Sequence, residues 1–398
     1  MIYLRFFIIP IYCFFLASGC AMLEIGKPQL TELNNNDIYH ALYPDTHKKT
    51  GINSPVLIQN FKLVNIQLPF SRLSNIDFST SELISVNLTH TNLNKIQFHG
   101  SKLVDTDFSN STLTNISFAG AELINVNFSN TTLINVDLSS ARIKNSTFKE
   151  TRFFDSRING AYISDSILSS VTFKKCSLKK ITFYYSSLDN SDFSNQNLKQ
   201  SNFMGSTINN SNFINTNLEH ANFSNARITN TSFLSSLMIN VTAINSLWTE
   251  TNLSAIKGIG MNFQKSSLKK VDMSDSDLRE SRFLEAEINQ SSLKRSNMEF
   301  SNFNFASVKL TSLSGANISR ASFNRASLTQ INLTKTTAKW TSFLMTDLSD
   351  SSFSEADIHK ADYRGANLKN TNFQKTVNYE NAIGFEKSKN FSTSLPPL

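Results

Sequence analysis

The sequence predicts a solenoid, because one large apolar residue recurs at every fifth position over most of the chain. From Leu63 to Phe373, the residues whose numbers end in 3 or 8 fill 63 positions, and 60 of these are Leu, Phe, Ile, Met, Val, Tyr or Trp. The exceptions are Ala243, Gly258 and Ala338. A spacing of five matches neither the 3.6-residue period of an α-helix nor the two-residue period of a β-strand. The chain is therefore predicted to be an array of five-residue units.

The units themselves follow a pattern of a small residue, Asp or Asn, and then a central apolar residue. Clear examples are SDFSN (191–195), ANFSN (221–225), ADYRG (361–365) and ANLKN (366–370). In these units the chain resembles the pentapeptide repeat proteins over about residues 58 to 376. The resemblance implies an all-β fold, a right-handed quadrilateral parallel β-helix in which four units make one square coil, with about sixteen coils. Before about residue 181, Ile or Val often replaces the small residue, and we expect less regular turns there.

A second periodicity, of twenty residues, supports a coil of four units. The positions directly after the centres are apolar at Val64, Ile84, Val104 and Ile124, whereas Ser74, ten residues away, is polar. The centres form phenylalanine ladders at the same interval, namely 153 to 233, 183 to 223 and 263 to 343. Stacked rings in every coil would fill a narrow interior and leave no ligand cavity. Any activity is therefore expected on the outer faces or at the ends.

The N-terminus has a different character. Arg5 is followed by an apolar run that is too short to span a bilayer comfortably, and the small residues at its end indicate a cleavage site. We therefore expect residues 1–19 to be a secretory signal peptide. The ending LASGC (16–20) resembles a bacterial lipobox, which implies that Cys20 is lipidated and becomes the mature N-terminus. The alternative is cleavage after Gly19 without modification of the cysteine.

Localisation and domain boundaries follow from these features. Ala21, directly after the lipid, favours a lipid-anchored place in the outer membrane of the bacterial envelope, with secretion as the alternative. Residues 20–57 lack the repeat and are expected to form a lipid-anchored tether and an N-terminal cap. The β-helix is expected over residues 58–376, followed by a C-terminal cap and tail over residues 377–398, because exposed β edges promote aggregation. Within the array, residues 243–263 are either a distorted hinge or a slightly irregular coil.

No motif for catalysis, cofactor binding or metal binding is recognisable. The six histidines are dispersed, and none stands at metal-ligand spacing from another ligand. The sequence has no Gly-rich phosphate loop and no Cys-x-x-Cys pair. Cys176 falls at an inward small position, where a buried structural thiol is expected. We therefore expect no enzymatic activity, no cofactor and no metal.

Charge separates the candidate functions. One cytoplasmic branch of the family is thought to mimic DNA through an acidic rod and to bind topoisomerase. This chain has a formal net charge of +7 and an N-terminal export signal, and both features argue against that function. Nucleic acid is not expected as a partner for a different reason: the basic residues are divided over the faces and diluted by acidic residues such as Glu219 and Glu280. We expect instead a non-catalytic, lipid-anchored envelope protein, a rigid rod-like scaffold for an unknown protein or envelope component. The alternative is an exported effector that associates with host membranes or proteins.

Val64, Ile84, Val104 and Ile124 are the candidate interaction residues. They occupy equivalent places in four successive coils and would form one apolar ridge roughly 15 Å long. This ridge could be covered in one of three ways: by a partner, by a second copy in a homodimer, or by residues 21–57 folded back along the rod.

Overall fold

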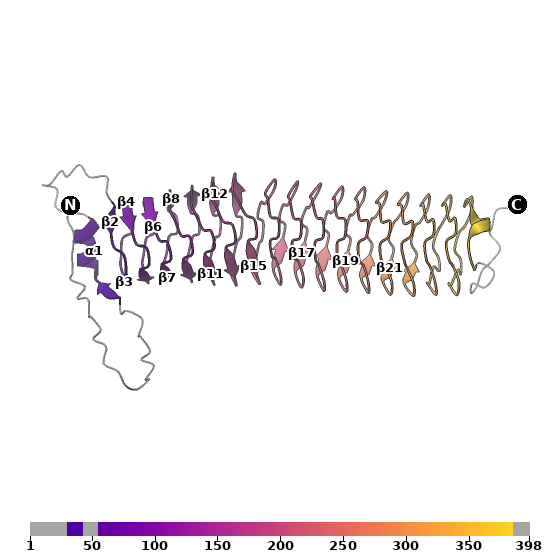
Figure 1. Ribbon diagram of the computed structural model, residues 1–398, viewed down its shortest axis with the longest axis horizontal. Helices are drawn as coiled ribbons and strands as arrows, with labels where there is room; N and C mark the ends of the chain where they lie inside the picture. The colour runs from indigo at the N-terminus through magenta and orange to yellow at the C-terminus, as the bar shows by residue number, and fades with distance from the viewer. Residues whose placement is uncertain (1–29, 43–54, 385–398) are drawn as a thin grey trace, which may run out of the picture.

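The computed structural model describes residues 30–42 and 55–384, which form a long rod of stacked coils (Figure 1). Each coil pairs in parallel with the next at a register of twenty residues, as in the pairs Leu63 with Leu83 and Leu83 with Leu103. The sixteen residues at this interval from Leu63 to Tyr363 are all buried, one in each coil. We call this side of the rod the Leu63 wall. The predicted fold class, a quadrilateral parallel β-helix, is confirmed.

The strands gather in three parallel sheets. The first, on the Leu63 wall, contains β1 (Thr31–Leu33), β3 (Phe61–Val64), β5 (Glu82–Ile84), β7 (Lys102–Val104), β9 (Glu122–Ile124), β11 (Arg142–Lys144), β13 (Tyr162–Ser164) and β15 (Thr182–Tyr184). The second, on the opposite or Leu73 wall, contains β2 (Val56–Leu57), β4 (Arg72–Asp77), β6 (Asn92–Gln97), β8 (Thr112–Thr114), β10 (Thr132–Ile134), β12 (Arg152–Phe154) and β14 (Thr172–Lys174). The third contains β16 (Thr207–Asn209), β17 (Arg227–Thr229), β18 (Leu247–Thr249), β19 (Ser267–Lys269), β20 (Glu287–Asn289), β21 (Ser307–Lys309) and β22 (Ser327–Thr329).

Each five-residue unit ends at a corner of the square, where the backbone is left-handed. The φ angle is 62° at Asn60, 56° at Asn65 and 59° at Asn225, and the same sign recurs along the array. Asn and Gly tolerate this conformation better than other residues, which explains their frequency at the fifth position. The corners are left-handed before residue 181 as well as after it. The corners still differ between the two parts: strands recur every ten residues before residue 185 and every twenty residues after it, so fewer units of the N-terminal part end in a regular turn.

The small inward residues satisfy the backbone of the neighbouring coil. The Ser191 hydroxyl donates to the Leu168 carbonyl at 2.7 Å and accepts from the backbone N–H of Val171 at 3.2 Å. Ser211 repeats the pattern, donating to the Leu188 carbonyl and accepting from the Ser191 N–H. The hydroxyls of Ser191 and Ser211 are therefore buried with their hydrogen bonds met, which is the condition for burying polar groups cheaply. Ser301, at the equivalent place, is an exception, because its hydroxyl has no partner.

The aromatic ladders fill the interior. Phe203 stacks on Phe223 with a centroid distance of 4.6 Å, and Phe193 stacks on Phe213 at 4.8 Å. Rings from the two opposite walls also meet edge to face, as between Phe203 and Phe213 at 5.8 Å. The predicted stacking is confirmed for all three ladders.

Residues 243–263 form regular coils. The register of twenty continues through Thr242 with Asn262, and β18 pairs with β17 and β19 in the third sheet. Gly258 replaces an apolar centre, but a Cβ there would lie 2.5 Å from the sulfur of Met261, so the methionine already occupies that space. The hinge hypothesis for this segment is therefore wrong.

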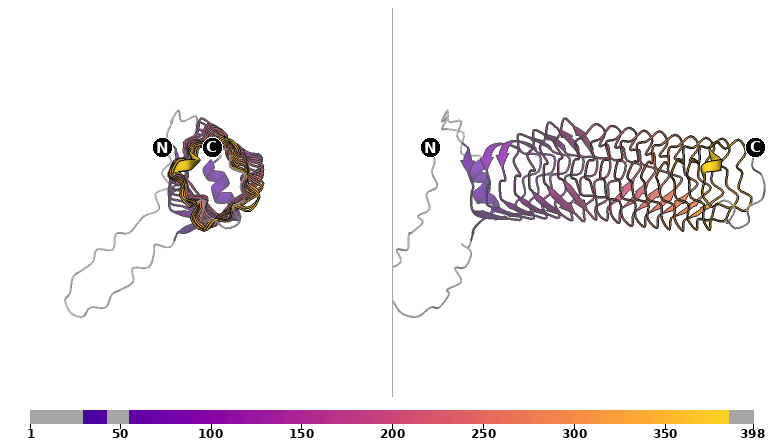
Figure 2. Two further views of the ribbon diagram at one scale, coloured as in Figure 1. Left: turned by 90° about the vertical axis from the view of Figure 1, so that its right-hand side faces the viewer. Right: turned by 45° about the vertical axis from the view of Figure 1, so that its right-hand side comes forward.

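Both described ends of the rod carry extra structure. Helix α1 (Asn35–Leu42) lies across the opening of the first coil, as the view along the axis shows (Figure 2), and its Ile38 is fully buried in the core. At the other end, a 3-10 helix, η1 (Tyr379–Asn381), follows the last coil, and Ile383 still pairs with Asp362. Within residues 30–42 and 55–384, no helix has the length and hydrophobicity needed to cross a membrane.

Candidate interaction surfaces

The predicted apolar ridge is continuous in the structure. Val64, Ile84, Val104 and Ile124 lie on β3, β5, β7 and β9, where each pairs in register with the next. All four side chains are half-buried, so each presents part of its surface to solvent. β-Branched residues suit a strand, which gives a modest folding reason for their choice. Their role as an interaction site stays a prediction.

The described part of the N-terminal segment does not cover this ridge. Ile38 packs into the core at the end of the rod, and Leu33 and Leu42 pack partly buried against the same core. Residues 30–42 therefore close the first coil and leave the ridge half-exposed, so the folded-back covering is wrong for this part of the chain. Cys20 and the predicted signal peptide lie outside the described residues.

A second surface, which the sequence reasoning missed, lies at the corners of the C-terminal half. Five large apolar side chains there are 49–56% exposed: Phe300, Phe305, Leu310, Trp340 and Met345. All five stand at the fifth position of a unit, with φ between 52° and 61°. A bulky residue in the left-handed region costs on the order of 1 kcal/mol, and such strain often concentrates at functional sites. In the sequence, this surface is indicated by a bulky apolar residue at the fifth position of a unit, where Asn or Gly is usual.

Four of these residues border one side of the rod. Phe300 and Trp340 lie along one corner of the Leu63 wall, and Phe305 and Met345 lie along its other corner, which follows from their places in the five-residue units. We call these four residues the aromatic corners. The apolar ridge lies on the same wall, nearer the N-terminus.

Cations from the next coil cover three of the exposed rings. The Arg320 guanidinium carbon lies 5.3 Å from the centroid of Phe300, and that of Arg325 lies 5.9 Å from the centroid of Phe305. The Lys360 ammonium nitrogen lies 4.2 Å from the Trp340 ring. The corner with Phe300 and Trp340 therefore alternates rings and positive charges, whereas the corner with Phe305 and Met345 has one such pair. Contacts of this kind contribute about 0.5–1 kcal/mol at exposed sites.

The surface between the aromatic corners is held by a polar network. The Asn304 side-chain oxygen accepts from the Ser322 hydroxyl at 2.6 Å and from the Asn324 N–H at 2.8 Å. The Asn324 side-chain oxygen in turn accepts from the Ser342 hydroxyl and the Leu344 N–H. Because these amides are fixed by neighbouring coils, the wall between the corners is preorganised.

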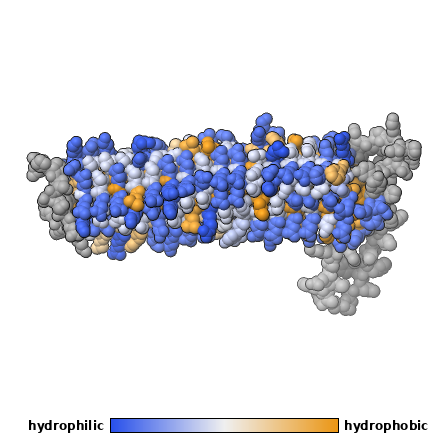
Figure 3. Space-filling model, turned by 180° about the vertical axis from the view of Figure 1, so that it is seen from behind, coloured by the Kyte–Doolittle hydropathy of each residue, from blue (hydrophilic) through white to orange (hydrophobic). Residues whose placement is uncertain are grey.

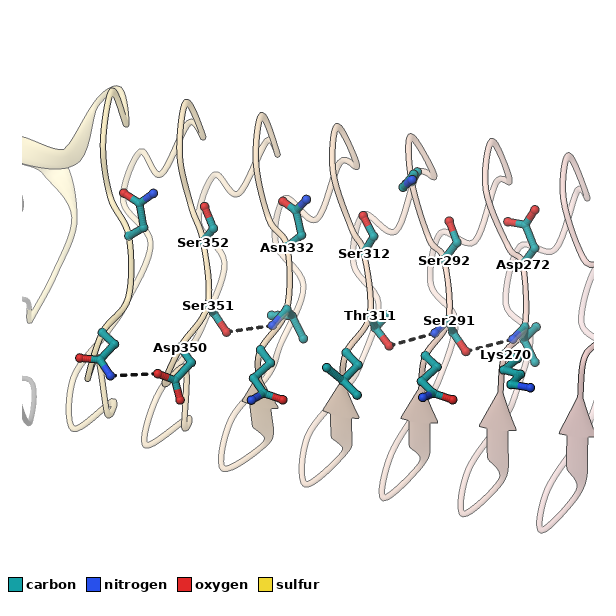
Figure 4. A pocket seen from close by; sticks show the side chains of 18 residues that line it. Lys270, Asp272, Ser291, Ser292, Thr311, Ser312, Asn332, Asp350, Ser351 and Ser352 are labelled. Carbon is teal, nitrogen blue, oxygen red and sulfur yellow. Dashed lines mark hydrogen bonds between the residues drawn. The ribbon is translucent and has the colours of Figure 1, made fainter.

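A shallow, open groove runs along a different side of the same half. It lies between corner residues such as Lys270 and Asp350 and outward residues such as Asp272, Ser292 and Asn332 (Figure 4). Its floor combines the inward hydroxyl residues Ser291, Thr311 and Ser351 with Val271 and Ile331. The hydroxyls engage the backbone; that of Ser351, for example, accepts from the Ile331 N–H at 3.1 Å. The lining combines hydroxyl and amide side chains with Lys270, Lys294, Asp272 and Asp350, so it offers hydrogen bonds and charges of both signs.

Ion pairs neutralise much of the surface charge. Arg364 donates to both carboxylate oxygens of Asp362, its Nη2 lying 2.7 Å from Oδ2, and this contact holds the pKa of Asp362 below its usual value. Arg279 likewise lowers the pKa of Asp277.

On the face shown in Figure 3, hydrophobic side chains form separate patches among hydrophilic ones. No cluster of His, Cys, Asp or Glu suited to a metal ion occurs among residues 30–42 and 55–384.

Cys176 is the free cysteine of the described chain, and it is less buried than predicted. Its side chain is partly exposed, and the sulfur lies 3.4 Å from the Lys174 carbonyl oxygen. Burial raises the pKa of this thiol, which favours the protonated, less reactive form.

Comparison with protein families gives two matching models. The model described as "Pentapeptide repeat region" matches residues 106–183. The model described as "Pentapeptide repeats (8 copies)" matches residues 62–100, 186–225, 197–234, 260–295, 291–334, 311–350, 331–370 and 346–377. No curated protein matches the chain significantly.

Several solved structures are similar to parts of the chain. HetL, a pentapeptide repeat protein involved in heterocyst differentiation regulation from the cyanobacterium Nostoc sp. strain PCC 7120, is 18% identical over 62% of this chain and 100% of its own, with a TM-score of 0.29. QnrB1, a plasmid-mediated fluoroquinolone resistance protein, is 20% identical over 48% of this chain and 91% of its own, with a TM-score of 0.33. A protein from the thylakoid lumen of Arabidopsis thaliana is 31% identical over 24% of this chain and 67% of its own, with a TM-score of 0.23.

Proposed function

The chain belongs to the pentapeptide repeat family, and on that premise we propose that it is a rigid, non-catalytic rod that binds a protein partner on its outer surface. The filled interior is the observation that carries this proposal. Stacked rings and buried side chains occupy every described coil, so recognition has to use walls, corners or ends. Each coil contacts its neighbours along the whole axis, which keeps such a rod straight and its surfaces at fixed spacing.

We assign the binding of this partner to the aromatic corners. Phe300, Phe305, Trp340 and Met345 expose apolar surface at positions where folding alone favours Asn or Gly. Rings and guanidinium groups are the side chains most enriched at the energetic centres of protein interfaces. The nearby Arg320, Arg325 and Lys360 favour a partner surface with acidic side chains around an apolar centre.

We further propose that the rod is anchored in the bacterial envelope through a lipidated Cys20. The apolar N-terminal run and the LASGC ending (16–20) support this, and acyl chains hold a protein on a membrane by burying CH₂ groups. Mass spectrometry of the mature N-terminus tests it: we expect a diacylglyceryl-modified Cys20. An unmodified Cys20 or an intact Met1 would refute the anchor while leaving the binding proposal standing.

Affinity capture from cross-linked cells tests the binding proposal. The tagged full chain should retain a specific partner that is lost from a variant carrying Phe300→Ala and Trp340→Ala. Phe70→Ala is the matched control, because Phe70 is also exposed at a left-handed corner and stacks on His90 at 4.8 Å, but lies near the N-terminal end. If the double variant captures the same proteins as the wild type, the aromatic corners are not the binding site.

A further inference from the structure

A column of alternating charge runs beside the apolar ridge in the first sheet. It occupies the residue before the centre of each strand, and the residues pair in register from one strand to the next. The column reads Glu32, Lys62, Glu82, Lys102, Glu122 and Arg142 along β1, β3, β5, β7, β9 and β11. All six side chains are half-buried or exposed. We call this the charge column.

The charge column runs beside the ridge and extends one strand beyond it at each end. The four ridge residues lie two positions after the inner four charges, on the same strands and the same face. Beyond Val64, the position preceding the ridge belongs to Asn34, and beyond Ile124 the following position belongs to Lys144. The apolar stretch is therefore closed by an exposed polar residue at each end.

The charge column is self-complementary when its direction is reversed. A two-fold axis across the rod, between β5 and β7, places Glu82 opposite Lys102 of a second copy. The same rotation brings opposite charges together at Lys62 with Glu122 and at Glu32 with Arg142. It also lays the ridge on the ridge, with Ile84 against Val104 and Val64 against Ile124. We propose that a second copy of this chain binds here, antiparallel and face to face through the first sheet.

The rims of this face allow two flat walls to approach each other. The corner next to the charge column carries Gly100, Gly120, Ser140 and Gly160, and a Cβ added at Gly120 would meet no atom within 4 Å. The same corner carries Phe300 and Trp340 in the C-terminal half, where large side chains stand above the wall. The corner next to the ridge carries Asn65, Ser85, Asp105 and Asn125. Short side chains along the N-terminal half therefore leave the ridge accessible to a flat surface.

Folding alone accounts for the alternation only in part. Opposite charges on neighbouring strands do stabilise a sheet, and Lys62 lies 3.6 Å from Glu32. Along the rest of the charge column, from Glu82 to Arg142, the structure shows no ion pair within 4.0 Å. Glu82, Lys102 and Glu122 are thus available to a partner, while the Arg142 guanidinium carbon lies 5.8 Å from the centroid of the Tyr162 ring. Isologous two-fold contacts are the commonest way for a chain to meet its own copy.

The contact is small. Six strands at about 4.8 Å spacing give an overlap roughly 25–30 Å long. The buried area is then on the order of 1,000 Å² in total, at the lower limit of specific interfaces. Charge complementarity would fix orientation and register, while the ridge supplies the apolar centre. This inference uses a different part of the rod from the aromatic corners, so it stands independently of the proposed function.

Charge reversal on the full-length chain tests the pairing. Two copies with different tags are co-expressed, one tag is captured, and the other is quantified. Wild-type copies should capture each other, whereas Glu82→Lys with itself and Lys102→Glu with itself should each lose capture by about tenfold or more, because like charges then face each other twice. Co-expression of Glu82→Lys with Lys102→Glu should restore capture, since both facing pairs become complementary again.

Two further combinations make the result specific. Lys62→Glu with Glu82→Lys should not restore capture, because these positions do not face each other in the proposed register. Arg152→Glu, an equal reversal of charge at an exposed position on β12 of the opposite wall, should leave capture unchanged. Recovery in the mixed pair shows that both single variants fold. Absence of wild-type capture, or equal capture in every combination, would overturn the proposal.

Discussion

The indole ring of Trp248 fills the place in the core that Ala243 leaves empty. Ala243 stands between Phe223 and Phe263 in the ladder of the Leu63 wall, and Trp248 extends from the next wall to contact both rings, at centroid distances of 5.8 and 5.6 Å. Its Nε1 donates to the Ser246 hydroxyl at 2.7 Å. One oversized and one undersized residue thus compensate for each other, and the coil remains regular.

This compensation predicts strong coupling between the two positions. Ala243→Phe should overpack the core and cost about 1–3 kcal/mol, and Trp248→Ala should leave a cavity and cost about 3–5 kcal/mol. In the double variant the new phenylalanine occupies the space of the indole, so the loss should be at least about 1 kcal/mol smaller than the sum. Urea unfolding of the three variants measures this, and additive losses would show that the side chains do not share one space.

Core and corner positions should respond differently to substitution. Phe203→Ala removes a ring that stacks on two others and should cost about 3–5 kcal/mol. Asn225 is an exposed corner residue with φ of 59°, so Asn225→Gly should change stability by less than about 0.5 kcal/mol. Urea midpoints of the two variants decide the matter. Similar losses of stability in the two variants would mean that Phe203 does not point into the core or that Asn225 does not lie at the surface.

Acid should weaken the rod at its C-terminal end. The Arg364 contact lowers the pKa of Asp362 below its usual value in the folded chain, so the contribution of this carboxylate is complete above its unfolded pKa and is lost as the pH falls through the folded value. The effect is expected to stay below about 1 kcal/mol because solvent screens the pair. Arg364→Gln should therefore reduce the loss of stability between about pH 5 and pH 2, measured by urea unfolding. An unchanged pH profile would show that the pair contributes nothing.

The residues of the aromatic corners should lower the stability of the fold while they contribute to partner binding. Trp340→Asn places a residue that tolerates φ of 60° where a tryptophan is strained, and it removes the contact with Lys360. We expect a melting temperature equal to or above that of the wild type, together with loss of partner capture. Phe70→Asn serves as the control, with the same relief of strain and unchanged capture. A clear loss of stability in Trp340→Asn would indicate that the ring serves folding instead.

The five-residue spacing was sufficient to predict the fold, because burial of one centre per unit determines both the coil and its register. The ridge at Val64 and Ile84 was also predictable, since a period of twenty brings these residues together. The exposed corner residue Trp340 was not predicted, because the apolar periodicity at the position after each centre does not include the fifth position. That position becomes informative only once its left-handed backbone conformation is known. The supposed hinge at Ala243 failed for a different reason: compensation by Trp248 crosses between walls, and a single ladder does not reveal it.

Every coil contains twenty residues, so the place of a residue on this rod is given by two independent quantities: its coil along the axis and the wall or corner on which it lies. Val64 and Leu344, for example, lie on one wall, fourteen coils apart, because their numbers differ by a multiple of twenty. Adding twenty residues between them would lengthen the spacing by about 4.8 Å without changing direction. Adding ten would leave the distance almost the same and turn the second surface to the opposite side. Duplication of units can therefore change the distance between two binding surfaces and the direction in which each faces independently of one another.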